Sequence, residues 1–243
     1  MKLEICVDSV ESAVIAQEAG ADRIELCSCL DVGGLTPSLG AITSAKSVLE
    51  IPIHVLIRPR MGDFCYSDLE FQQMLRDLRL AKDTKTEGVV FGILTPDGKV
   101  DIYRTALLLE AARPLQVTFH RAFDFCVDPF QALEDLISLG VDRILTSGQK
   151  NTAPQGAPLL KELIEKADNR VIIMPGSGIN SQNLPSLIKD TGAREFHLSA
   201  SRFLPSPMLS KNQTLDPKGF GNAELSLRQA DGDEIRKIRQ LLS

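Results

Sequence analysis

Thiol, imidazole, carboxyl and guanidinium groups recur at alternate positions of short apolar runs in this chain of 243 residues. Parallel strands of α/β proteins are usually apolar on both faces, so a polar row departs from what a purely structural strand shows. Thiols can hold a soft metal ion, whereas carboxyl and imidazole groups can exchange protons with a substrate. The polar row therefore predicts a functional site. Its main members are Glu4, Cys6, Glu25, Cys27, Arg58, His120 and His197.

Eight strand-like runs, separated by helical patterns, position these groups. The runs cover residues 3–7, 23–27, 53–58, 88–93, 116–120, 142–146, 171–174 and 195–199. Apolar residues at helical spacing mark residues 10–21, 69–84, 101–113, 129–140, 159–168, 182–192 and 233–242. An open doubly wound sheet usually has a Gly-rich turn after its first strand, where this chain has VDSVES.

The repeated βα unit predicts an α/β fold, a (β/α)₈ barrel of the TIM type, because such barrels commonly form one domain of about 250 residues. We expect a single domain over residues 1–243. Its barrel core spans 1–201, and residues 202–243 form an irregular segment with a C-terminal helix.

The period of two fixes which strand residues face the barrel interior. Aliphatic and aromatic residues such as Leu3, Ile5 and Phe119 face the helices, so their polar neighbours face inward. Four inward residues lie low in the strands and are expected to form internal salt bridges: Glu4, Arg23, His54 and Glu195. Residues near the C-terminal strand ends are the site candidates, because barrel enzymes place their chemistry there.

Cys6 and Cys27 end neighbouring strands and form a candidate site for copper(I), which prefers thiolate ligands. Adjacent strands lie about 4.8 Å apart, close enough for two thiols to share one ion. The alternative is that both are buried thiols that act as small apolar side chains. Cys29 could add a ligand, and no Cys-x-x-Cys pair indicates structural zinc.

A second interpretation is an enzyme acting on a small phosphorylated or carboxylated metabolite. Glu25 and His120 would then perform acid/base catalysis, with Arg58 and Asp124 as further catalytic candidates. The candidate anion-binding residues are Arg60, Arg121, Ser147, Gly148, Gly176, Ser177, Gly178, His197 and Ser199. Each has a structural alternative: the arginines of RPR can clamp a loop, and HRxxD can be an internal hydrogen-bond network. A third interpretation is a non-catalytic scaffold that uses its outer helices.

Six motifs in order resemble the CutC family of copper homeostasis proteins. They are IELC with GGLTPSLG, IRPRMGDFCYSDLE, GVVFGILTPDGKVD, VTFHRAFD, RILTSGQ and IIMPGSGI, and the resemblance covers about residues 2–200. It implies a TIM-type barrel, a copper-related role with Cys6 and Cys27 as proposed ligands, and a homo-oligomer.

Composition argues against two kinds of partner. The net charge of −5, with both signs mixed along the chain, gives no basic surface for nucleic acid or an anionic membrane. The five cysteines are scattered and odd in number, which does not fit a disulfide framework. With no signal-peptide pattern at the start, we expect a cytoplasmic protein.

Overall fold

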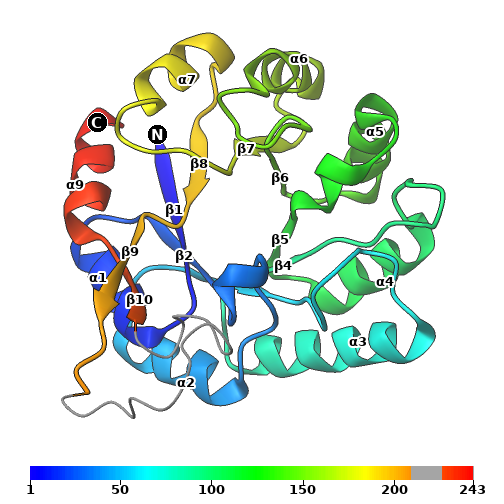
Figure 1. Ribbon diagram of the computed structural model, residues 1–243. Helices are drawn as coiled ribbons and strands as arrows, with labels where there is room; N and C mark the ends of the chain where they lie inside the picture. Colours follow the sequence, from blue (N-terminus) through cyan, green and yellow to red (C-terminus); the bar gives the residue numbers. More distant parts are fainter. Residues whose placement is uncertain (209–225, 243) are drawn as a thin grey trace, which may run out of the picture.

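The computed structural model describes residues 1–208 and 226–242 and shows a (β/α)₈ barrel (Figure 1). Eight parallel strands surround the centre in the order β7-β6-β5-β4-β3-β2-β1-β8. A parallel bridge between Gly176 and His197 joins the two ends of this sheet. The strands are β1 (Lys2–Val7), β2 (Arg23–Leu26), β3 (Ile53–Leu56), β4 (Gly88–Phe91), β5 (Gln116–Phe119), β6 (Arg143–Thr146), β7 (Ile172–Pro175) and β8 (Glu195–Leu198). The fold class and the eight strands predicted from the sequence are confirmed.

Helices form the outer ring of the barrel (Figure 1). They are α1 (Val10–Glu18), α2 (Leu39–Val48), α3 (Asp68–Asp83), α4 (Ile102–Ala112), α5 (Pro129–Leu139), α6 (Ala157–Ala167), α7 (Leu184–Thr191) and α9 (Gly232–Leu241). Helix α3 begins with a capping box, in which Ser67 accepts from the Glu70 amide and Glu70 accepts from the Ser67 amide. In the described residues, no helix is long and apolar enough to cross a membrane.

Helix α2 was not predicted, because small and hydroxyl residues weaken its apolar pattern. Ser38 caps it, so part of the GGLTPSLG segment starts a helix and only the first part is a loop at the mouth.

Register places the predicted inner and outer rows on opposite faces of the barrel. In the β1–β2 pair, Glu4 lies opposite Arg23 and Cys6 lies opposite Glu25. The outward residues pack with the helices in one large apolar core. A separate small cluster inside the barrel contains Cys6, Cys27, Leu56 and Val90.

Ion pairs fill the lower part of the barrel, as the sequence predicted. Arg23 bonds to both Glu4 and Glu195, and Arg143 bonds to Glu195 at 2.7 Å. Burial disfavours the charged form of Glu4, but Arg23 and His197 outweigh it and hold the Glu4 pKa well below its usual range. Burial lowers the pKa of His54 to about 3, so this ring is neutral at pH 7. The network replaces the apolar filling usual in such barrels.

The segment after β8 is more ordered at its ends than the sequence suggested. Strands β9 (Ser201–Pro205) and β10 (Ser226–Ala230) form an antiparallel pair, and α9 follows as predicted. Helix α9 lies beside α1 and α7 and completes the outer ring there (Figure 1). The rest of the predicted irregular segment, 209–225, lies outside the described residues.

Candidate functional site

A cavity of about 360 Å³ opens at the C-terminal ends of the strands. It brings together most of the site residues predicted from the sequence. Those lining it are Cys6, Glu25, Arg58, His120, Arg121, Asp124, Ser147, Gly176, Ser177, Gly178, His197 and Ser199. Arg60, Gly148 and Cys27 do not line it.

The two predicted copper ligands lie side by side. Cys6 Sγ is 3.9 Å from Cys27 Sγ, and both side chains are almost fully buried. Cys27 lies next to Cys6 without lining the cavity, and its thiol is 3.4 Å from the carbonyl oxygen of Val7. The hydrogen bond to Cys27, followed by burial, raises the pKa of Cys6 well above its usual range. All five cysteines are free of disulfides.

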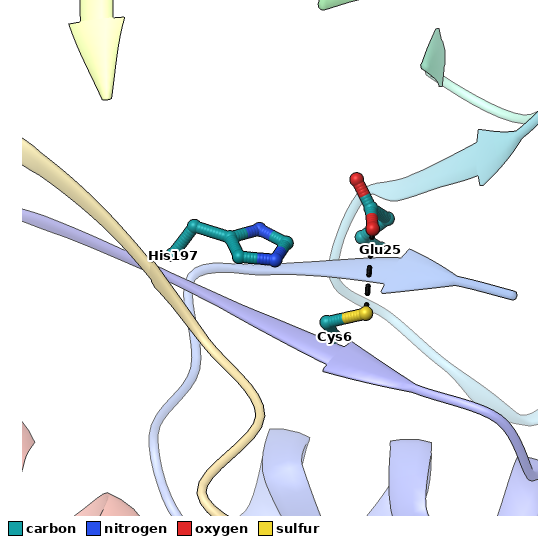
Figure 2. A group of neighbouring side chains, drawn as sticks. All are labelled: Cys6, Glu25 and His197. Carbon is teal, nitrogen blue, oxygen red and sulfur yellow. Dashed lines mark hydrogen bonds between the residues drawn. The ribbon is translucent and has the colours of Figure 1, made fainter. Parts of the chain in front are cut away.

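Cys6 also belongs to a group with Glu25 and His197, whose ligand-type atoms all lie within 4.8 Å of one another (Figure 2). Cys6 Sγ is 3.3 Å from Glu25 Oε1. The Nδ1 atom of His197 is 2.7 Å from Glu4 Oε1, which leaves Nε2 as the ring nitrogen available to a ligand.

Burial and neighbouring charges shift the pKa values of Glu25 and His197 in this group. Burial is the largest influence on Glu25 and raises its pKa. Burial opposes the charge of His197, but Glu25 and Glu4 outweigh it, so the pKa of His197 is raised. Both pKa values are therefore raised where these two residues line the cavity.

His120 is a neutral hydrogen-bond donor in the cavity wall. Its Nδ1 accepts from the amide of Ala122 at 3.2 Å, which places the ring proton on Nε2. Burial, followed by the positive charge of Arg58, lowers the His120 pKa to about 3. The Nε2 atom is buried and has no partner in the described part of the chain.

Arg58 and Arg60 hold loops, the structural role that the sequence left open for them. Arg58 donates to the carbonyl oxygens of Val32, Gly34 and Gly62 and still lines the cavity. Arg60 pairs with Glu70 at 2.6 Å and with Asp63 at 2.9 Å, away from the cavity.

Asp124 organises the loop after β6. Its carboxylate accepts from the hydroxyl of Thr146 at 2.5 Å and from the amides of Ser147 and Gln149 at 3.0 Å. No bond joins it to His120 or to an arginine in residues 1–208 and 226–242. Gly148 is explained by close packing, because a Cβ atom there would lie 2.4 Å from the carbonyl oxygen of Gly156.

Sequence reasoning missed several cavity residues. Leu30 and Phe64 come from the loops after β2 and β3, and Arg228 comes from β10. Arg228 pairs with Asp31, almost two hundred positions away in sequence. Local patterns carry no signal for such a contact. The Phe64 ring could have been suspected, because it follows the glycine of the RMGDF segment at the mouth.

The fold and the site define a (β/α)₈-barrel protein whose mouth cavity holds thiol, carboxyl and imidazole groups. Comparison with known proteins identifies the family within this class. The model of the CutC family matches residues 1–202, and the chain belongs to that family.

Two relatives and one solved structure illustrate the similarity. The human "Copper homeostasis protein cutC homolog" is 48% identical over 240 residues, covering 98% of this chain and 88% of that protein. A "family protein CutC" from Parabacteroides distasonis is 48% identical over 96% of this chain and 97% of its own length. The crystal structure of a putative copper homeostasis protein CutC from Streptococcus agalactiae has a TM-score of 0.79 and 34% identity, covering 82% of this chain and 98% of that one.

Solved structures of barrel enzymes show a more distant structural similarity to this chain. Phosphoribosyl anthranilate isomerase from Thermotoga maritima has a TM-score of 0.59 at 13% identity, covering 100% of this chain and 98% of that one. At that identity the likeness shows the shared fold only.

Proposed function

We propose that this protein binds copper(I) through the thiolates of Cys6 and Cys27. The separation of 3.9 Å between their sulfur atoms carries the proposal. Metal–thiolate bonds are about 2.3 Å long in zinc sites, so a single ion of similar size can bond to both sulfurs in a bent arrangement. Copper(I) prefers such soft ligands. The copper homeostasis names of the family members support the same assignment.

His197 is the natural third ligand. It belongs to the compact group with Cys6, and its Nε2 is the ring nitrogen that is not bonded to Glu4. Imidazole also suits copper better than the carboxylate of Glu25 does. The bond from His197 Nδ1 to Glu4 resembles the carboxylate–histidine pairs that orient ligands in metal sites. Glu4 would therefore position the ring.

Anaerobic titration with copper(I) against a competing chelator tests the proposal. Native protein should take up one ion, and both Cys6→Ser and Cys27→Ser should abolish tight binding. Cys126→Ser is the matched control, because Cys126 is another buried free thiol that does not line the cavity. Binding that survives loss of either mouth thiol would contradict the thiolate pair.

A second candidate function is acid/base catalysis in the same cavity. The observation that favours it is that Glu25 Oε2 and His120 Nε2 are buried without partners among the described residues. Polar atoms left unpaired in a binding cavity are costly unless a bound molecule pairs with them. Glu25→Gln and His120→Asn would then abolish turnover and leave the two thiols intact.

A scaffold acting through its outer helices predicts no effect of any of these substitutions. The cytoplasmic location and the homo-oligomer stay predictions.

A further inference from the structure

Two positive charges at the mouth lack a carboxylate partner in the described residues. Arg58 is only 5% exposed, yet all three of its bonds go to neutral carbonyl groups. Arg121 is exposed, stacks 6.0 Å from the ring of Phe125, and forms no ion pair within the same ranges. By contrast, Arg60 and Arg228 are paired with acidic residues. A buried cation is costly to maintain without a counter-charge, so an anion would stabilise this wall.

The acidic residues of the cavity do not supply that counter-charge. The carboxylate of Asp124 already accepts hydrogen bonds from the hydroxyl of Thr146 and from loop amides. Glu25 lies at the floor, bonded to Cys6. The positive side of the cavity is therefore open to a ligand.

His120 adds a donor beside the two arginines. The Phe64 ring lies 5.1 Å from the guanidinium carbon of Arg58 and 4.9 Å from the ring of His120. Arg121 directly follows His120 in the chain, and all three groups line the same cavity. Its Nε2 atom is buried and has no partner in the described residues, and His120 is part of the cavity lining.

From these three groups we infer that the cavity binds a small organic oxyanion, a carboxylate or a phosphate ester, with its acidic group at Arg121 and Arg58 and accepting from His120 Nε2. Arginine and a charge-assisted imidazole bond suit such oxygens. The inference does not depend on copper, because none of these residues is a proposed copper ligand.

Cavity size indicates that the ligand is more than a bare ion. Liquid water occupies about 30 Å³ per molecule, so a cavity of about 360 Å³ has room for an organic part as well. That part would face the backbone of Gly176 to Gly178 and the unpartnered Glu25 Oε2. Arg58 and Arg121 also line a second cleft, which shares Gly33 and Phe64 with the cavity as well.

The test uses inorganic phosphate and acetate as the smallest probes of the two anion types. Calorimetric titration of native protein should show saturable binding of at least one. Arg121→Gln should raise its dissociation constant about tenfold, the loss expected for one charge-assisted bond. Arg79→Gln is the matched control, because it removes the same charge from an exposed position on α3 outside the cavity, and it should leave the constant unchanged.

Nitrogen-detected NMR of the histidine rings provides a second readout that does not depend on a variant. His120 should appear as the Nε2–H tautomer, and its signals should shift on addition of the bound probe. His54, buried among the ion pairs below, should not shift. Absence of saturable binding by both probes, equal weakening by Arg121→Gln and Arg79→Gln, or an unmoved His120 would overturn the inference. Copper binding by Cys6 and Cys27 would be unaffected by any of these results.

Discussion

The Nδ1 atom of His197 lies 2.7 Å from Oε1 of Glu4, and this bond joins the ion-pair network of the barrel to the mouth cavity. Glu4 also pairs with Arg23 below it. The protonation of a cavity residue therefore depends on a carboxylate that does not line the cavity.

Replacing Glu4 by Gln should lower the pKa of His197 in the metal-free protein. Burial works against the charged imidazole, and the carboxylates of Glu25 and Glu4 raise its pKa above the usual value. Removing the carboxylate of Glu4 leaves less negative charge to oppose the effect of burial, so the pKa of His197 should fall. NMR titration of the His197 ring measures the change. Glu134→Gln, in an exposed pair with Arg170, is the control and should leave His197 unchanged. An identical His197 pKa in native protein and Glu4→Gln would contradict this coupling.

Glu195→Gln should destabilise the fold strongly. Glu195 holds two buried arginines, with bonds of 3.0 Å to Arg23 and 2.7 Å to Arg143. Breaking a buried ion pair from one side typically costs about 3–5 kcal/mol, because the remaining charge is left without compensation. Urea unfolding at pH 7 measures the loss. Glu134→Gln on the surface should change the unfolding midpoint very little, and a similar effect of both substitutions would show that the network is not what stabilises the barrel.

The alternation of residue types was enough to predict which strand faces point into the barrel interior. Ile5 and Cys6 differ in character because one faces helices and the other faces the interior, and such a period-two pattern is local information. The same pattern correctly assigned Glu4, Arg23 and Glu195 to internal salt bridges. It was wrong for His54, because burial keeps this ring neutral and its Nδ1 has no hydrogen-bond partner in the described residues.

Contacts made by long side chains to loops could not be predicted in this way. Nothing local to Arg58 shows that its guanidinium reaches the carbonyl groups of Val32 and Gly34, since that choice depends on loop paths. The sequence made both Arg58 and Arg60 candidates for the site, yet only Arg58 lines the cavity. The separation of Cys6 and Cys27 also depends on strand register and side-chain direction, which a sequence pattern fixes only approximately.

His120→Asn should make stability less sensitive to mild acid. Burial, followed by Arg58, lowers the pKa of His120 to about 3, so the folded protein keeps this ring neutral while the unfolded chain protonates it near pH 6.5. The unfolded state binds more protons between these values, and stability therefore falls as pH drops through that window. Between pH 7 and 5 this residue should account for roughly 2 kcal/mol of the loss.

Urea unfolding of native protein and His120→Asn at pH 7 and pH 5 measures that difference. Asparagine keeps an oxygen that can accept from the amide of Ala122. His54 and His197 are the same in both proteins, so their contributions cancel in the comparison. Equal acid sensitivity of the two proteins would show that His120 is not held neutral by the fold.

Copper(I) affinity should increase with pH if Cys6 and Cys27 are the ligands. A thiol must lose its proton to bind the ion, so each proton released makes the affinity rise about tenfold per pH unit. The hydrogen bond to Cys27 and burial raise the Cys6 pKa well above its usual range, which means that the increase should continue past pH 8. Anaerobic chelator competition at pH 6, 7, 8 and 9 measures the slope, with a chelator whose own pH dependence is known. Cys126→Ser should give the same slope as native protein, because its thiol is outside the cavity. A copper affinity that stays constant from pH 6 to 9 would mean that no thiol proton is displaced and that the ion binds elsewhere.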